Sequence, residues 1–388
     1  MYDQIISFTN LLKAYYKARR SKRFKRRLQK IEIDFEDRLI NICYQLKNQS
    51  YQPKKYHRFL VFEPKKRQIS APAFIDRIIH HAILIVIEPL FDKLFIPSSF
   101  ACQKNKGTHS GMLYIARRYG KLIKKYEILY ALKCDIKQYF ANIEHNVLFE
   151  LLSKVITCPK TLWLLKLIID SYKDSPGKGI PIGNLTSQLF ANIYLHELDL
   201  YVTKYLKVQY YFRYMDDFLV LSHDIEPLKK LREKIKLFLS EKLYLSLHPK
   251  KVNIFRADRG LDFVGYCIKP DGISMRKKTL RRYKKRHKKR IKLLEKSKMQ
   301  LKKYKTYSQL PLFTTSKLND EVKYELEEKI RKQKEKLRVS RNSFKGFLRY
   351  SKHKKLATGG VKVNGIIIPK IFSRKKISSK QLTIFQFR

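Results

Sequence analysis

Two adjacent carboxylates inside an apolar run place the tightest constraint on how this chain can fold. Asp216 and Asp217 lie between the aromatic segment 208–214 and the aliphatic segment 218–221, and such runs are typical of β-strands. A buried carboxylate without a partner costs several kcal/mol, so it takes up a proton or finds a cation. A tight turn between two strands avoids that cost, because it presents both acids to a metal ion. An ordinary Asp-Asp hairpin turn is the alternative interpretation.

The charge of the chain indicates a polyanionic partner. Its 388 residues carry 86 Lys and Arg against 33 Asp and Glu, a net charge of +53. Self-repulsion weakens a compact fold at that charge, whereas phosphate groups relieve it, so nucleic acid is the expected partner. A basic membrane-surface protein is the alternative, but we find no amphipathic anchor or lipidation site. We therefore expect no membrane partner, and the scattered cysteines indicate a reduced, cytoplasmic location.

The order of the expected elements predicts an α+β fold, in which an antiparallel sheet carries helices on one face. The 44% hydrophobic content is sufficient for two or three subdomains. We expect basic helices to residue 55, two short strands within 56–70 and a helix over 76–95 that Pro89 breaks. A strand over 128–136 and helices over 145–155 and 159–172 should follow, and then a long helix from the loop 175–183 to residue 205. The acid hairpin comes next, followed by a helix over 227–243 and strands over 252–255 and 261–268.

Beyond residue 271 the composition becomes strongly basic. Of the 30 residues in 276–305, 17 are Lys or Arg and only Glu295 is acidic. We expect one helix there and another over 320–337, with a loop over 308–316 and β-like runs over 361–368.

A third acid, Asp135, follows a predicted buried strand and lies 81 residues before Asp216. Two metal ions in a catalytic site lie about 3.5–4 Å apart and both contact phosphate, so the acids that hold them come from separate elements. Asp135 supplies the acid that the adjacent pair lacks. A turn or capping role is the alternative for a single Asp at a strand end.

Seven blocks of sequence, in the right order, resemble the reverse transcriptases. The resemblance covers about residues 55–270, and its blocks are Arg67-Gln68-Ile69-Ser70-Ala71-Pro72, Asp76-Arg77-Ile78-Ile79-His80-His81, the segment 99–109, Lys133-Cys134-Asp135-Ile136, Tyr214-Met215-Asp216-Asp217, His248-Pro249-Lys250-Lys251 and Asp262-Phe263-Val264-Gly265-Tyr266. Seven ordered blocks are specific, whereas the acid tetrad alone is not. The resemblance implies a right-hand polymerase fold and RNA-directed DNA synthesis.

The same resemblance implies a division into fingers, palm and thumb. We expect a basic helical extension (1–55), fingers (56–126), a first palm part (127–157), a loop of the fingers and palm (158–185), a second palm part (186–270), and a basic thumb with a C-terminal RNA-binding region (271–388). The partners it implies are a structured RNA template, the RNA/DNA hybrid and deoxynucleoside triphosphates.

By this resemblance Asp135, Asp216 and Asp217 are catalytic and hold two Mg²⁺ ions, with help from the carbonyl of Ile136. Mn²⁺ is the expected substitute. One ion would activate the primer 3′ hydroxyl, and the other would stabilise the leaving pyrophosphate.

Further residues are expected around the incoming nucleotide. They are Lys65, Arg67, Lys104, Phe140, Ile182, Gly183 and Lys251. Lys65 and Arg67 resemble the grip on the triphosphate, with template phosphate as the alternative ligand. The family usually has an arginine where this chain has Gln103-Lys104, so Lys104 or Lys106 is the expected substitute.

Two of these residues have chemically distinct roles in the family. Phe140 resembles the aromatic that blocks a ribose 2′-hydroxyl and so selects deoxynucleotides, and a core residue is the alternative. Lys251 resembles a lysine that gives a proton to pyrophosphate, and a solvated lysine is the alternative.

Contacts to primer and template are expected from the acid turn and from the basic region. Tyr214, Met215, Phe263, Gly265 and Tyr266 resemble primer-contacting residues, with a plain β-hairpin as the alternative at 263–266. The basic run contributes Arg276, Lys277, Arg281, Arg282, Lys284 and Lys285. We expect these side chains along the template-primer minor groove or on structured RNA, and a solvated helix face is the alternative.

The loop 181–188, Pro-Ile-Gly-Asn-Leu-Thr-Ser-Gln, indicates a subgroup. Group II intron and retron enzymes typically carry Pro-Gln-Gly and then Ser-Pro. This loop instead resembles the reverse transcriptases of diversity-generating retroelements, which copy a template RNA with errors at adenines. Ile182 would remove a polar contact near the nascent base pair and so loosen base selection, or it simply packs.

A small basic accessory protein is an expected partner in that setting. Two alternatives stay open: an anti-phage defence enzyme that copies a non-coding RNA, and a non-catalytic, maturase-like RNA-binding protein.

Overall fold

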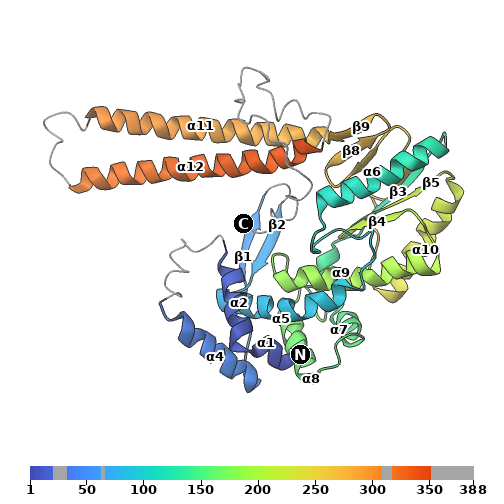
Figure 1. Ribbon diagram of the computed structural model, residues 1–388, viewed down its shortest axis with the longest axis horizontal. Helices are drawn as coiled ribbons and strands as arrows, with labels where there is room; N and C mark the ends of the chain where they lie inside the picture. The colour runs from blue at the N-terminus through green and yellow to red at the C-terminus, as the bar shows by residue number, and fades with distance from the viewer. Residues whose placement is uncertain (21–32, 63–65, 308–316, 351–388) are drawn as a thin grey trace, which may run out of the picture. The chain divides into compact units, whose positions relative to one another are not determined.

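Four antiparallel strands form the sheet that carries the candidate acids (Figure 1). Their order in space is β4 (Tyr211–Tyr214), β5 (Asp217–Ser222), β3 (Tyr130–Asp135) and β6 (Asn253–Arg256). The computed structural model describes residues 1–20, 33–62, 66–307 and 317–350, and it divides after Arg259 into two units. The strands predicted over 128–136 and 252–255 and the acid hairpin are therefore present, all within the first unit.

Helices cover parts of both faces of this sheet. They are α6 (Thr108–Lys125), α9 (Leu185–Leu200) and α10 (Glu226–Lys242). Arg213 of β4 bonds to Asp199 of α9, whereas Phe212 points to the opposite face and meets the ring of Tyr114 on α6 at a centroid distance of 6.0 Å. The prediction of helices on one face is wrong, because β3 and β5 have buried residues on both faces and each face needs a cover.

The N-terminal helices belong to the first unit. They are α1 (Tyr2–Ile6), α2 (Phe8–Arg19) and α4 (Phe35–Lys47). The first two pack against α5 (Phe74–Asp92), and α4 packs against α1 and α2. The amide of Asn10 donates to the carbonyl of Ala82 at 3.0 Å, which joins α2 to α5. Pro89 does not break α5, although it removes one helical hydrogen bond, because the buried stripe that includes Ile83 and Ile87 continues to Phe91. Burial of that stripe keeps the helix intact.

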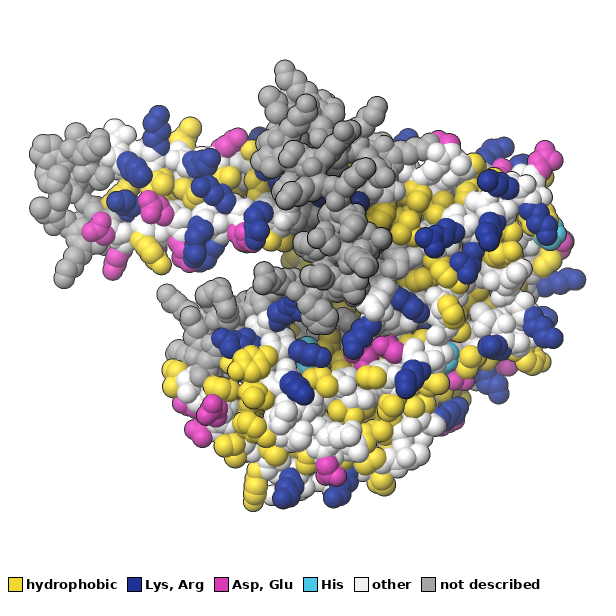
Figure 2. Space-filling model, in the orientation of Figure 1, with side chains coloured by type: hydrophobic (Ala, Val, Ile, Leu, Met, Phe, Trp, Pro, Cys, Tyr) yellow, Lys and Arg dark blue, Asp and Glu magenta, His cyan; other side chains and the backbone are white. Residues whose placement is uncertain are grey.

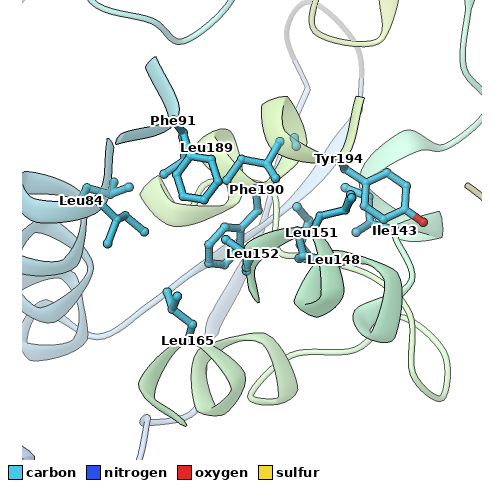
Figure 3. Packing of buried hydrophobic residues seen from close by; sticks show 14 of the residues in the cluster. Leu84, Phe91, Ile143, Leu148, Leu151, Leu152, Leu165, Leu189, Phe190 and Tyr194 are labelled. Atoms are coloured by element: carbon cyan, nitrogen blue, oxygen red, sulfur yellow. The ribbon is translucent and has the colours of Figure 1, made fainter. Parts of the chain in front are cut away.

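One hydrophobic core joins α5 and α9 to two further helices, α7 (His145–Ser153) and α8 (Pro159–Asp170). Figure 3 shows Phe190 of α9 among the leucines of α7 and α8, including Leu148, Leu152 and Leu165. A short 3₁₀ turn, Tyr139–Asn142, follows β3, and a π-helical turn, Tyr201–Tyr205, ends α9. The acid-bearing sheet packs against this core.

A two-stranded sheet precedes α5. Its strands β1 (His57–Val61) and β2 (Arg67–Ala71) pair antiparallel, which confirms the two short strands predicted within 56–70. Every residue of β1 except Val61 is exposed, so this hairpin presents most of its first strand to solvent.

The second unit, from Gly260 onward, combines a small sheet with two long helices. The sheet is formed by β7 (Leu261–Phe263), β8 (Tyr266–Lys269) and β9 (Gly272–Met275), and the helices are α11 (Lys277–Tyr307) and α12 (Lys317–Arg349). Figure 1 shows α11 and α12 lying side by side. The sequence placed the strands of 261–268 with the palm, but the structure groups them with these helices.

Contacts along their length hold α11 and α12 together. The rings of Tyr283 and Phe344 stack with centroids 3.5 Å apart, and Gln333 donates to the hydroxyl of Ser297 at 3.1 Å. The second helix is longer than predicted, while the predicted loop 308–316 and the β-like runs at 361–368 lie outside the described residues. Among the described helices, none combines the length and apolar content needed to cross a bilayer.

Candidate active site

The acid pair lies at the turn end of the β4–β5 hairpin, with Asp216 in the turn and Asp217 at the start of β5. Tyr214 and Asp217 are the last paired residues, and Met215 and Asp216 form the turn between them. Met215 has φ of +56°, in the left-handed region that a turn this tight requires and that side chains disfavour. The sequence therefore predicted both the hairpin and the position of its turn correctly.

Strand register brings the third acid to the same place. Asp135 at the end of β3 pairs directly with Asp217 at the start of β5, so their side chains lie on one face of the sheet. The backbone N–H of Ile136 donates to the carbonyl of Asp216 at 3.3 Å, and the carbonyl of Asp135 accepts from His248 at 2.8 Å. The adjacent pair and an acid 81 residues earlier in the sequence thus meet at one end of the paired strands.

Two lysines face these acids. Lys251 Nζ lies 2.6 Å from Asp135 Oδ1, and Lys133 Nζ lies 3.7 Å from Asp217 Oδ2. Within the described part of the chain, no group of three or more His, Cys, Asp or Glu side chains is arranged to hold a metal ion. Sequence reasoning missed Lys133, although its position two residues before Asp135 on a strand places it on the same face.

The environment of Asp216 disfavours its charged form. Burial raises the pKa of the Asp216 carboxyl above its ordinary value, and the nearby charge of Asp135 raises it further. The positive charges of Lys251 and Arg67 act in the opposite direction. A cation bound beside these acids would relieve both the desolvation and the repulsion.

Backbone hydrogen bonds join three of the segments expected around a nucleotide. The N–H of Ser70 on β2 donates to the carbonyl of Ile182 at 3.0 Å, and the N–H of Ile180 donates to the carbonyl of Phe140 at 2.9 Å. Gly183 has φ of +108°, and a Cβ there would lie 2.6 Å from Cγ2 of Ile69, so only glycine fits. The strand of Arg67, the loop 180–183 and the segment after Asp135 are therefore neighbours.

The remaining predicted nucleotide contacts fall elsewhere. Lys104 is exposed and lies near the acids Glu88 and Asp92 of α5. Lys106, the other expected substitute, donates from Nζ to the carbonyls of Ile96 and Ser99 and so supports its own loop. The predicted contact at Lys65 lies outside the described residues.

The predicted primer contacts of the second unit lie around a tight turn between β7 and β8. Phe263 pairs with Tyr266, and the turn residues Val264 and Gly265 both have positive φ, as a two-residue type I′ hairpin requires. The side chains of Phe263 and Tyr266 are fully buried, so the turn presents its backbone and the half-buried side chain of Val264. The N–H of Arg276 donates to the carbonyl of Gly265 at 3.1 Å and ties the start of the basic run to this turn.

Most of the predicted basic contacts project into solvent. Lys277, Arg281, Lys284 and Lys285 are exposed on α11, whereas Arg276 and Arg282 are half-buried. Figure 2 shows Lys and Arg side chains along both α11 and α12. A surface of this kind can follow a phosphate backbone without fixing a sequence.

Known proteins resemble the chain over the part that contains this site. Residues 52–268 match the family model described as reverse transcriptase (RNA-dependent DNA polymerase). The group II intron-encoded protein LtrA of Lactococcus lactis subsp. cremoris is 24% identical over 60% of this chain and 50% of its own length. Protein YkfC of Escherichia coli strain K12 is 25% identical over 56% of this chain and 68% of its own length. The chain thus spans half the length of the lactococcal relative.

A solved structure adds a more distant likeness. Apo telomerase from Candida tropicalis, truncated from its C-terminal domain, aligns with a TM-score of 0.44 and 15% identity. That alignment covers 60% of this chain and 58% of the telomerase chain.

Proposed function

The chain belongs to the reverse transcriptase family, and from that premise we propose that it is an RNA-directed DNA polymerase. The observation that carries the proposal is the register of the acids. Asp135 pairs directly with Asp217, and the backbone carbonyl of Asp216 accepts from the N–H of Ile136, so the three acids lie together at one end of the paired strands. A protein that only bound RNA would have no use for this cluster of acids in a chain of net charge +53.

The donor set suits a hard divalent cation. Carboxylate and carbonyl oxygens are the ligands that Mg²⁺ prefers, so Asp135, Asp216, Asp217 and the Ile136 carbonyl would hold two Mg²⁺ ions, with Mn²⁺ as a substitute. When bound, such ions activate the primer 3′ hydroxyl and stabilise the leaving pyrophosphate.

The lysines of the site then have two tasks. Lys251 and Lys133 neutralise the acids before a cation binds, and both must release them when it does. Lys251, once released from Asp135, holds a proton at Nζ close to the site of bond formation and can give it to pyrophosphate.

Primer extension tests the activity. The reaction contains an RNA template, a DNA primer, Mg²⁺ and four deoxynucleoside triphosphates, and the control is the Asp216→Asn/Asp217→Asn double variant. We expect cDNA from the wild type and none from the variant. No cDNA from the wild type, even with its native RNA and neighbouring proteins added, would support a maturase-like RNA-binding protein instead.

We further propose that copying is error-prone, as in a diversity-generating retroelement. Ile182 supports this role, because its carbonyl is bonded to Ser70 of β2 and its side chain offers no polar group to a base pair. Base discrimination depends on contacts made in the transition state, so their loss lowers fidelity. A small basic accessory protein would be a partner in this setting.

Sequencing of the cDNA distinguishes the roles. We expect errors concentrated opposite template adenines, and we expect Ile182→Gln to reduce them by about 5- to 10-fold, which corresponds to one net hydrogen bond of roughly 1–1.5 kcal/mol. An unchanged error spectrum in Ile182→Gln would remove this residue from the explanation. Accurate or repetitive cDNA would favour an anti-phage defence enzyme.

A further inference from the structure

A fully buried ion pair lies directly beneath the acid turn. Neither Arg213 of β4 nor Asp199 of α9 has any exposed side-chain surface. Arg213 binds Asp199 with two nitrogens, Nε to Oδ1 at 2.7 Å and Nη2 to Oδ2 at 2.6 Å, and Tyr211 donates to Oδ1 at 2.8 Å. Burial alone would lower the pKa of Arg213, but the attraction of Asp199 raises it above its ordinary value, so the guanidinium stays charged.

The third nitrogen of Arg213 reaches the turn itself. Nη1 donates to the carbonyl of Met215 at 3.3 Å and to the side-chain oxygen of Asn192 at 3.2 Å. Asn192 in turn donates to the carbonyl of Ala101 at 2.7 Å. The guanidinium therefore links α9, the loop of Ala101 and the acid turn through one planar group.

The backbone of Arg213 is held as firmly as its side chain. Its N–H donates to the carbonyl of Ser98 at 3.0 Å, and its carbonyl accepts from the N–H of Phe100 at 3.0 Å. These bonds form a short parallel bridge at the outer edge of β4. The strand that leads into the turn is thus fixed on its outer edge by this bridge and from below by α9.

The turn needs such support. Met215 has positive φ, a conformation that costs a non-glycine residue of order 1 kcal/mol or more and that persists where the surroundings enforce it. Both carbonyls of the turn are bonded to groups outside it: that of Met215 to Arg213, and that of Asp216 to the N–H of Ile136. Loss of either bond would free the turn to move Asp216 relative to Asp135.

Stability alone does not explain the presence of this buried ion pair. A buried ion pair can often be replaced by apolar residues of similar volume without loss of stability. No apolar side chain, however, can donate to the Met215 carbonyl. The geometry therefore favours a role in holding the turn over a role in filling the core.

We propose that Asp199 and Arg213 are positioning residues that hold the Met215–Asp216 turn so that Asp216 and Asp217 stay in register with Asp135. The proposal rests on the proposed polymerase function. Asp199 orients the guanidinium, and Arg213 bonds the turn carbonyl, so neither touches the reacting atoms. Groups that orient the ligands of a metal site typically change metal affinity or activity 10- to 100-fold when they are lost.

Two variants remove the contact to the turn in different ways. In Arg213→Lys, the lysine keeps a positive charge beside Asp199 but cannot reach both Asp199 and the carbonyl of Met215. Arg213→Met/Asp199→Leu replaces the ion pair with apolar groups. The matched control is Arg256→Lys, because Arg256 forms a similar two-point pair with Asp258 (3.0 and 3.1 Å) on β6, but near the surface.

The first measurement is hydrogen exchange of the segment 211–222 in full-length protein without metal, beside the melting temperature. We expect exchange at the turn to accelerate about 10-fold or more in both variants at a melting temperature near that of the wild type, and to stay unchanged in Arg256→Lys. The second measurement is primer extension, in which kcat should fall and the Mg²⁺ concentration for half-maximal synthesis should rise about 10-fold.

Wild-type exchange at the turn together with wild-type kcat in either folded variant would overturn the proposal. If Arg213→Lys fails to fold, the apolar double variant decides, because it leaves no uncompensated buried charge. If the wild type makes no cDNA, the polymerase function fails while hydrogen exchange still decides whether the pair holds the turn.

Discussion

The acid-bearing sheet and the α11–α12 helices carry charge in opposite ways. In the sheet, charged side chains have defined partners, such as Lys251 on Asp135 or the buried Arg213 on Asp199. On α11 the basic residues are numerous and mostly exposed, and 17 of 30 residues in 276–305 are Lys or Arg. The first region depends on geometry and the second on charge density. Single substitutions should therefore have large effects in the first and small, additive effects in the second.

The largest effect is expected at Asp135. Asp135→Asn removes one ligand of the site, and we expect kcat for primer extension to fall about 10³-fold or more, because residues that act as a unit fail together. The fold should survive, since Lys251 is partly exposed and can return to water. Steady-state primer extension with a circular dichroism spectrum checks both points.

The control for that prediction is Asp258→Asn, an acid of the first unit that pairs with Arg256 just beyond β6. It should retain wild-type kcat. Activity of Asp135→Asn above a tenth of the wild type would show that the acid cluster is not the catalytic centre.

A smaller effect is expected at Phe140, which is half-buried after β3. If its ring blocks the ribose 2′-hydroxyl, Phe140→Ala should lower the preference for deoxynucleotides over ribonucleotides about 10- to 100-fold, the usual worth of one steric contact. Single-nucleotide incorporation with dGTP and GTP measures the ratio. Phe149→Ala, at a half-buried ring on α7, is the control, and equal preference in the two variants would assign Phe140 to packing.

The ionised carboxyl of Asp216 should also lower the stability of the fold. The raised pKa of Asp216 means that the folded chain holds this proton more tightly than the unfolded chain does. Its contribution to stability is therefore fully present below the ordinary pKa of an aspartate and is lost as pH rises through the raised value. Asp216→Asn cannot ionise, so we expect it to be more stable than the wild type near pH 7.5, by about 0.5–2 kcal/mol.

Urea unfolding in metal-free buffer at several pH values measures this difference. The gap between Asp216→Asn and the wild type should widen as pH rises, whereas Asp37→Asn, at an exposed acid of α4, should show no such trend. A gap that narrows with pH would mean that the charged form of Asp216 is favoured in the fold.

The sequence predicted what depends on local pattern. The acid hairpin, the strand before Asp135 and the basic helix of α11 each follow from composition and periodicity within one segment. Seven ordered blocks then indicated the family, and the match over residues 52–268 confirmed it.

What the sequence could not predict depends on contacts between distant segments. Lys133 faces Asp217 only because β3 and β5 pair in one register, and Arg213 is buried only because α9 places Asp199 beneath it. An arginine beside two acids would more readily be assigned to the surface. The burial of Phe263 and Tyr266 likewise results from the small sheet of the second unit, which the blocks do not reveal.

The smallest effect for each charge removed is expected on α11, and it provides the sharpest test of the comparison. If the exposed lysines contact phosphate one by one, Lys284→Gln/Lys285→Gln should reduce the slope of log affinity against log salt by roughly 0.7–0.9 per lost contact and leave kcat unchanged. Fluorescence anisotropy with an RNA/DNA hybrid at several salt concentrations measures the slope.

Lys234→Gln/Lys236→Gln on α10 removes the same charge from exposed positions of the first unit and is the control. Equal slopes in the two variants would mean that only net charge matters, whereas a large loss of kcat in the α11 variant would show that these helices also depend on geometry.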